Sequence, residues 1–359
     1  MALDYSTLKN KAIIYAEPGT TKTQVVELPV TAPGPGEVLV RLEYSGVCHT
    51  DYGFCTNAFK GNPIPTPQGQ IGGHEGVGKI VALGPGVTSP PVGTVVGIKY
   101  AADACLNCSI CLEGGETSCP SVRVSGFYTP GTFQQYCISW AKYVTPIPPE
   151  ITDLAAAAPL MCAGITMYTA LKRAGVKYND WVLISGAGGG LGHLGIQYAK
   201  AMGARVLAID SGSKEQFCKS LGAEAFLDFS KFDAAGLATQ VHEVTGGGAR
   251  IVLMCVSHQS AYDQAVGWLG FRGKVICLGV PEGDLKPIAG AVVGSMLMME
   301  QSIMAIKTGN RLEAKESLDI VAAGRVKTHY QLRKMDELTQ IFDDMHAGKF
   351  EGRAVIDLR

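Results

Sequence analysis

The 359-residue sequence predicts an α/β protein in which a β-rich part adjoins a doubly wound parallel sheet. Up to about residue 160, short runs alternate apolar and polar side chains and are separated by turns and irregular loops. Beyond that point, short apolar runs alternate with helical stretches, and one run enters a helix through a glycine-rich loop. Strands that alternate with helices in this way predict a parallel sheet with right-handed crossovers.

The β-rich part contains at least three predicted strands. Glu37–Glu43 alternates polar and apolar side chains, as a half-buried strand does. Gly76–Leu83, which is followed by the turn Gly84–Gly86, and Gly93–Lys99 are two more short strands. Cysteine-rich loops lie between these strands.

The second part is predicted from its apolar runs and helical periods. The predicted strands are Trp181–Ile184, Arg205–Ile209, Glu224–Asp228, Ile251–Val256 and Lys274–Leu278. The predicted helices are His193–Met202, Ser213–Leu221 and Ala261–Leu269.

A third part begins at about residue 302. It holds two helical patterns, Leu312–Ala323 and Met335–Ala347, and ends on a strand, Arg353–Leu358, that is expected to return to the first part. Before the parallel sheet, the uncharged and alanine-rich stretch Leu154–Leu171 predicts a buried helix rather than a membrane span.

Composition and charge exclude several classes of function. Hydrophobic residues make up 47% of the chain and charged residues 18%, which argues against extended disorder. The formal charge of −1 argues against a nucleic-acid partner and a membrane-binding basic patch. Met1–Asp4 has no signal-peptide pattern, so we expect a cytoplasmic protein whose eleven cysteines are reduced and serve metal binding or catalysis.

The glycine-rich loop fits a dinucleotide site because it joins a strand to a helix. Its register places Ala187 at the first glycine of the G-x-G-x-x-G pattern. Gly189 lets the backbone approach a pyrophosphate, and Gly192 lets the helix pack close to the strand. We expect Gly189, Gly190 and Leu191 to contact the cofactor. A glycine-rich turn without a cofactor is the alternative.

Asp210 favours NAD over NADP. It stands eighteen residues after Gly192, at the end of the next predicted strand. A carboxylate there accepts both ribose hydroxyls and repels a 2′-phosphate. A surface or capping aspartate is the alternative. Lys214 follows four residues later and is either a ribose contact or an exposed lysine.

Four cysteines in one short segment predict a structural zinc site. Cys105, Cys108, Cys111 and Cys119 have the spacing C-x2-C-x2-C-x7-C. Four thiolates suit tetrahedral zinc with no open position. An iron–sulfur cluster is the first alternative, but the last spacing is too long for the ferredoxin pattern. Coincidental free thiols are the second.

A second zinc site is dispersed over three segments. Its candidates are Cys48, His74 and Cys162. Two thiolates and a neutral imidazole leave the fourth zinc position open for an alcohol or carbonyl oxygen. Each residue alone is weak evidence, since cysteines are often simply buried, and spacing alone does not join the three segments.

The motifs together resemble the zinc-containing alcohol dehydrogenases of the medium-chain dehydrogenase/reductase superfamily, particularly the tetrameric yeast type. The matching stretches, spread over nearly the whole chain, are Gly46–Asp51, Gly72–Gly76, the four-cysteine loop, Gly131–Tyr136, Met161–Thr166, Ile184–Gly192 and Gln197–Gly203. The resemblance implies a GroES-like catalytic domain, residues 1–162 and 302–359, split around a Rossmann domain, residues 163–301. It also implies a homotetramer that binds two zinc ions per chain and NAD.

The resemblance implies roles for the zinc-site residues. Cys48, His74 and Cys162 match the catalytic zinc ligands, and Glu75 matches a possible alternate ligand. Asp51 matches the carboxylate that orients the histidine ligand.

The resemblance also implies the cofactor contacts and the proton path. His49 matches the position that contacts the cofactor phosphate, and Thr50 matches the hydroxyl that takes the proton from the zinc-bound alcohol. Thr166 matches a nicotinamide-side position, and Arg353 matches a C-terminal cofactor contact. The implied reaction is reversible hydride transfer between a primary or secondary alcohol and NAD.

Three features depart from the family pattern. Gly53 stands where a histidine usually completes the proton path, so a histidine restored there is expected to speed alcohol oxidation near neutral pH. The segment between Cys48 and His74 is a few residues longer than in the yeast pattern and carries Phe54, Cys55, Phe59 and three prolines. Tyr100 stands at a large aromatic pocket position. These changes predict a substrate larger than ethanol, with neutral drift as the alternative.

Two other functions compete with this prediction. A zinc-free enone or quinone reductase shares the superfamily, but the complete ligand set opposes it. A non-enzymatic cofactor-binding member is the other alternative, which Thr50 and the ligands oppose and Gly53 supports.

Overall fold

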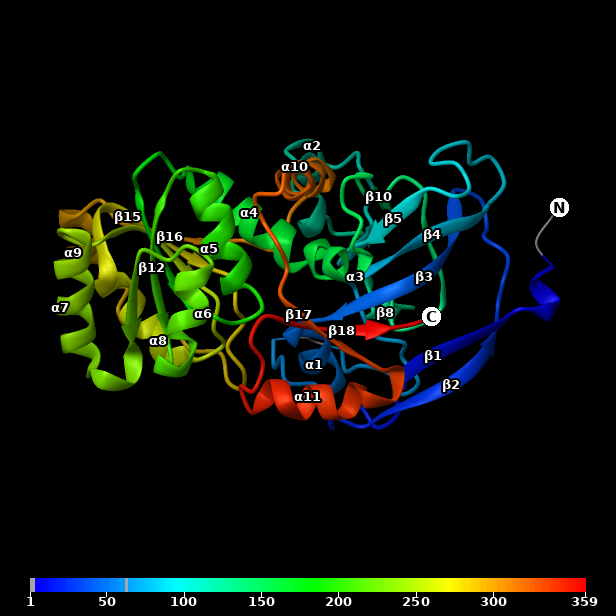
Figure 1. Ribbon diagram of the computed structural model, residues 1–359, viewed down its shortest axis with the longest axis horizontal. Coiled ribbons are helices and arrows are strands. Elements are labelled where there is room, and N and C mark those ends of the chain that lie inside the picture. The colour runs from blue at the N-terminus through cyan, green and yellow to red at the C-terminus, as the bar shows by residue number, and fades with distance from the viewer. Residues whose placement is uncertain (1–3, 62–63) are drawn as a thin grey trace.

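The computed structural model describes residues 4–61 and 64–359. Residues 1–3, on which part of the signal-peptide argument rests, and Pro63 of the lengthened segment lie outside the described residues. Figure 1 shows two parts side by side along the longest axis: a parallel sheet with its helices, and a twisted β-rich part. Helices α4 (Ala163–Ala174) and α10 (Arg311–Ala322) lie between them.

The parallel part is a six-stranded sheet in the order β13-β12-β11-β14-β15-β16. Its strands are β11 (Trp181–Ser185), β12 (Arg205–Asp210), β13 (Ala225–Asp228), β14 (Ala249–Met254), β15 (Leu269–Cys277) and β16 (Ser302–Ala305). Every neighbouring pair is parallel. The predicted α/β class and parallel sheet are therefore confirmed. The expected domain boundary at 301/302 falls just before β16, which pairs with β15.

Helices cover both faces of this sheet. They are α5 (Gly192–Ala201), α6 (Glu215–Ser220), α7 (Ala234–Thr245), α8 (Gln259–Ala265) and α9 (Val293–Met298). The helix predicted at Ser213–Leu221 begins as a 3-10 turn before α6. Helix α7 and helix α9 were not predicted; α7 buries only Leu237 and Val241, which leaves a weak apolar period to detect.

The β-rich part centres on a seven-stranded sheet in the order β10-β5-β4-β3-β18-β17, with β9 paired to β3. Its strands are β3 (Glu37–Val47), β4 (Gly76–Leu83), β5 (Val95–Ile98), β9 (Tyr136–Trp140), β10 (Thr145–Pro146), β17 (Tyr330–Arg333) and β18 (Arg353–Asp357). The C-terminal strand β18 pairs antiparallel with β3, with Ala354 opposite Val47. The predicted return of the chain to the first part is therefore confirmed.

Smaller elements surround this sheet. They are the hairpin β1 (Lys9–Tyr15) and β2 (Thr23–Pro29), the three-stranded sheet β6 (Ala101–Asp103), β7 (Arg123–Ser125) and β8 (Tyr128–Thr129), and the helices α1 (His49–Cys55), α2 (Ser109–Leu112) and α11 (Leu338–His346).

The buried stretch Leu154–Leu171 is not one helix. Helix α3 (Leu154–Ala157) passes into a 3-10 turn, and α4 starts at Ala163 after a bend of 51°. Pro159 supplies no backbone N–H for a continuing helix, and Cys162 leaves the helical region at ψ −65° and φ −128°. Within the described residues, no single helix is long and apolar enough to cross a membrane. The two helices of this bent pair reach that length and apolar composition only when they are taken together.

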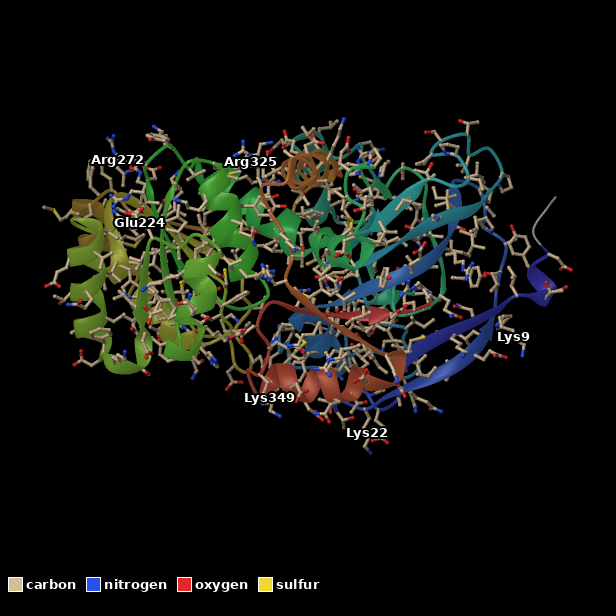
Figure 2. The ribbon with its side chains drawn as sticks, viewed as in Figure 1. Lys9, Lys22, Glu224, Arg272, Arg325 and Lys349 are labelled. Carbon is tan, nitrogen blue, oxygen red and sulfur yellow. The ribbon has the colours of Figure 1, made fainter. Side chains whose placement is uncertain are left out.

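One apolar cluster joins the two parts. Val77 of β4 and Val355 of β18 belong to the same buried cluster as Val182 of β11, through the side chains of α3 and α4. The charged side chains of Lys9, Arg272 and Lys349 lie at the outer edges of the molecule in Figure 2. The segment around Cys162 thus lies where the two parts meet.

Candidate metal and cofactor site

The three dispersed zinc candidates converge. Ligand atoms of Cys48, His74, Glu75 and Cys162 all lie within 4.8 Å of one another. Cys48 stands between β3 and α1, His74 and Glu75 directly precede β4, and Cys162 occupies the bend before α4. Because β3 and β4 are antiparallel neighbours, the end of one strand lies beside the start of the next.

Asp51 fixes the orientation of His74. The Nδ1–H of His74 donates to Asp51 Oδ1 over 2.9 Å, and both side chains are fully buried. Asp51 also accepts the backbone N–H groups of Cys48 (2.9 Å) and Gly73 (3.2 Å). Burial lowers the pKa of His74, but Asp51 and Cys48 together outweigh burial and raise that pKa well above its ordinary value.

The cluster fits a zinc ion. The Nε2 atom of His74 is buried and has no hydrogen-bond partner among the described residues, as a ligand atom reserved for a metal would be. The contact with Cys162 holds the pKa of Cys48 well below its usual range, while the same contact raises the pKa of Cys162. Two thiol groups that share a buried contact with an imidazole match the ligand chemistry of zinc.

Glu75 forms a buried ion pair with Arg353 of β18. Burial raises the pKa of Glu75 to about 8, although the guanidinium of Arg353 opposes that shift. Gly46 leaves room for this carboxylate, since a Cβ there would lie 2.1 Å from Glu75 Oε2. The C-terminal strand therefore supplies a cation directly beside the zinc ligands.

The four-cysteine loop forms a second cluster. Ligand atoms of Cys105, Cys108, Cys111 and Cys119 lie within 4.8 Å of one another. Backbone N–H groups, including that of Cys108 at 3.4 Å, lower the pKa of Cys105 to about 6. Four sulfur ligands fill a tetrahedral zinc site completely, so this cluster suits a structural ion.

The loop is anchored to the rest of the molecule. Glu116 accepts from the side chain of Arg311 at the start of α10 (3.0 Å), and Tyr143 donates to the same carboxylate (3.2 Å). Tyr143 also packs with Cys111 and Cys119 in a small apolar cluster. Loss of a zinc ion from this loop would therefore also weaken the contacts that hold the start of α10.

The glycine loop between β11 and α5 has the predicted context. A Cβ on Gly192 would lie 2.5 Å from Ala187 Cα, so the close approach of helix and strand requires glycine there. Both Asp210 oxygens accept backbone N–H groups, those of Gly188 and Ser211, at 2.8 Å each. Lys214 Nζ lies 3.7 Å from Asp210, so its ammonium is close to that carboxylate.

Arg353 also reaches the glycine loop. A Cβ on Gly190 would lie 2.8 Å from Arg353 Cδ, and the N–H of Gly352 donates to Gly188 O over 3.3 Å. The Nε of Arg353 is buried without a hydrogen-bond partner among the described residues. A buried, unpartnered guanidinium N–H beside a phosphate-type loop fits the pyrophosphate of a dinucleotide.

Three predicted residues lie on helices next to the zinc cluster. Thr50, half-buried, is the second residue of α1 and lies two positions after Cys48. Thr166 donates its hydroxyl to Cys162 O in the first turn of α4 (2.7 Å). His49 Nε2 contacts Glu282 Oε1 at 2.6 Å.

Phe59 explains why residue 53 is glycine. A Cβ on Gly53 would lie 2.3 Å from Phe59 Cζ, so the phenyl ring fills the space that a side chain at 53 would enter. Phe59 packs edge-on against Phe54 (5.8 Å between ring centroids), and Phe54 stacks on Phe127 (4.5 Å). The lengthened segment therefore builds an aromatic cluster beside α1.

Two family models match the chain. One, described as the alcohol dehydrogenase GroES-like domain, matches residues 34–149; the other, described as zinc-binding dehydrogenase, matches residues 190–323. Alcohol dehydrogenase 2 of Emericella nidulans is 46% identical over 98% of both chains. The alcohol dehydrogenase of Schizosaccharomyces pombe is 41% identical over 97% of both. The chain belongs to the zinc-binding alcohol dehydrogenase family.

Solved structures agree with this family. The alcohol dehydrogenase of Aeropyrum pernix superposes with a TM-score of 0.86 at 28% identity, covering 97% of this chain and 99% of that one. The acetophenone reductase of Geotrichum candidum, solved with NAD, has a TM-score of 0.83 at 28% identity and covers 99% of this chain and 98% of that one. The GroES-like and Rossmann parts expected from the sequence are therefore confirmed.

Sequence reasoning missed one residue at this site. Glu282 belongs to no recognised motif and lies 233 positions from His49 along the chain. Its partner becomes evident only when the segment after β15 is placed against α1.

Proposed function

We propose that this chain is an NAD-linked zinc alcohol dehydrogenase that interconverts primary or secondary alcohols with aldehydes or ketones. The single observation that carries the proposal is the convergence of Cys48, His74 and Cys162, with Asp51 behind the imidazole. The same ligand set opposes a zinc-free enone or quinone reductase, which has no use for it.

Each residue of the zinc site has a separate role in the proposed reaction. A zinc ion held by Cys48, His74 and Cys162 would supply a Lewis acid for the alcohol oxygen, and NAD would accept the hydride. Thr50 accepts the alcohol proton and passes it toward the cofactor ribose. Asp51 keeps the imidazole of His74 in the tautomer that ligates. Glu75 is an alternate ligand once Arg353 releases it.

The cofactor contacts are proposed on the same basis. Gly189, Gly190 and Leu191 precede the N-terminus of α5 and face the pyrophosphate. Arg353 adds positive charge, and His49 adds a ring N–H donor. Asp210 is proposed to face the ribose, with Lys214 beside it. Thr166 is proposed on the nicotinamide side. The NAD complex of the Geotrichum reductase supports this cofactor.

The substrate proposed is larger than ethanol. Phe54, Phe59 and Phe127 form the aromatic cluster beside α1, and Tyr100 packs edge-on against His74 (5.6 Å between ring centroids). Tyr100 next to the ligand His74, together with the aromatic cluster at α1, favours an alcohol with a sizeable apolar substituent.

The assay that tests this function measures NADH formation with a panel of alcohols, with and without a zinc chelator. Chelator-sensitive NADH formation supports a zinc alcohol dehydrogenase. Chelator-insensitive reduction of enones would support the zinc-free reductase, and no turnover with any substrate would support a non-enzymatic member.

A homotetramer is also proposed. Helix α9 exposes Val293, Leu297 and Met298 by 71%, 72% and 82%, and β16 is one of the two edge strands of the parallel sheet. Exposed apolar side chains beside a free strand edge favour association with a second copy. The cytoplasmic location stays a prediction.

A further inference from the structure

Three basic side chains of the proposed cofactor site already contact carboxylates. Arg353 pairs with Glu75, and Lys214 lies 3.7 Å from Asp210. His49 pairs with Glu282 at 2.6 Å, and these two side chains are 38% and 30% exposed. The first pair is buried, and the second joins neighbours in the chain. Of these three pairs, only the His49 pair links the β-rich part to a segment of the parallel part through side chains that solvent reaches.

The segment that carries Glu282 is seated on the lengthened segment after α1. Gly283 forms a backbone bridge with Phe59. Leu285 lies over Gly61, since a Cβ there would lie 3.6 Å from Leu285 Cδ1. These contacts flank Glu282 on its C-terminal side and hold its carboxylate against His49. The pair is therefore part of a docked surface rather than a chance contact between two long side chains.

We propose that Glu282 lowers the affinity of the chain for its dinucleotide, because its carboxylate competes with the cofactor phosphate for His49. The inference rests on the proposed function, in which His49 contacts that phosphate. When the dinucleotide binds, Glu282 either gives up His49 or stays beside a phosphate of the same charge. Both alternatives weaken binding and speed release of the cofactor.

The first measurement is the Kd of NADH for the zinc-loaded protein, obtained by fluorescence titration at fixed salt concentration. Glu282→Gln keeps the size of the side chain and removes its charge. We expect the Kd for NADH to fall about two- to fivefold, as the loss of one partly exposed charge contact permits, and the NADH dissociation rate to fall with it. Asp284→Asn is the matched control: Asp284 is exposed on the same segment and makes no ion pair among the described residues. Its Kd should equal that of the unmodified protein.

A double-mutant cycle separates this inference from the proposed function. His49→Gln alone should weaken NADH binding, and Glu282→Gln should then have no further effect in the His49→Gln protein. An unchanged Kd in Glu282→Gln, or equal tightening with and without His49, would overturn the competition. An unchanged Kd in His49→Gln would instead overturn the phosphate contact of the proposed function, and the competition with it.

A readout without cofactor completes the test. If Glu282 docks its segment through His49, amide exchange around residues 280–285 should be faster in Glu282→Gln than in Asp284→Asn. Equal exchange in the two variants would show that the pair does not hold the segment.

Discussion

Gly53 and Phe59 form a steric pair next to the proposed proton path. The sequence alone presents Gly53 as the loss of a relay histidine, which a single substitution should restore. The ring of Phe59 removes the space for that histidine, with 2.3 Å between its Cζ and a Cβ at position 53. The glycine is thus required by the lengthened segment.

A histidine at position 53 should therefore act only when Phe59 is reduced in size. We expect Gly53→His alone to lose stability through overpacking, by about 1–3 kcal/mol, without a gain in alcohol oxidation. In Gly53→His/Phe59→Ala, kcat for oxidation should rise through a titration near pH 6–7, because only the neutral imidazole accepts the proton. The measurement is kcat against pH for both proteins, with Phe59→Ala as the control. The same titration in Gly53→His alone would contradict the steric pair.

Asp210 is the second residue whose environment sharpens a prediction. Both of its oxygens hold backbone N–H groups, so Asp210→Ala would loosen the glycine loop as well as remove a charge. Asp210→Asn keeps an acceptor and removes the charge. We expect the unmodified protein to prefer NAD over NADP by about tenfold or more in kcat/KM, and Asp210→Asn to reduce that ratio. Equal use of both cofactors by the unmodified protein would refute the assigned role.

Among the elements, the break between α3 and α4 differs from the sequence prediction of one buried helix. The zinc site depends on this break. An uncharged, alanine-rich stretch predicts one continuous helix, since its period has no interruption apart from Pro159. The bend of 51° places Cys162 outside regular helix and next to Cys48 and His74. The local pattern predicts the helix content of this stretch, and Pro159 is the one residue in it that indicates a break.

The two cysteine clusters should respond differently to removal of one ligand. Cys108→Ser should release one zinc ion and lower the unfolding temperature, at roughly 2–4 °C for each kcal/mol lost, because a closed site contributes folding energy and this loop anchors α10. Cys162→Ser should abolish turnover with a smaller change in unfolding temperature. Zinc content, activity and thermal unfolding of both variants provide the check. Two variants that stay stable and active would refute both metal assignments.

At the scale of the whole molecule, motifs with fixed spacing were predictable and contacts between the two parts were not. The four-cysteine motif and the glycine-rich motif each lie within one short segment, so their spacing alone reveals them. The approach of Cys162 to His74, and of Glu282 to His49, depends on how two sheets pack around a shared core. Only the resemblance to a family predicted that Cys162 lies near His74. The contact of Glu282 with His49 had no motif to reveal it.

Assembly is the last property of the whole molecule that the structure lets us test. On α9, Leu297 and Met298 expose 72% and 82% of their surface, and burial against a second copy would remove that surface from water. A charge at the centre of such a contact is costly to desolvate, so Leu297→Glu should shift the protein from the proposed tetramer toward smaller species. Leu312→Glu is the matched control, since Leu312 is 60% exposed on α10. Light scattering after gel filtration at several concentrations gives the mass of each protein. If Leu297→Glu keeps the mass of the unmodified protein at every concentration, α9 is not part of the interface between copies.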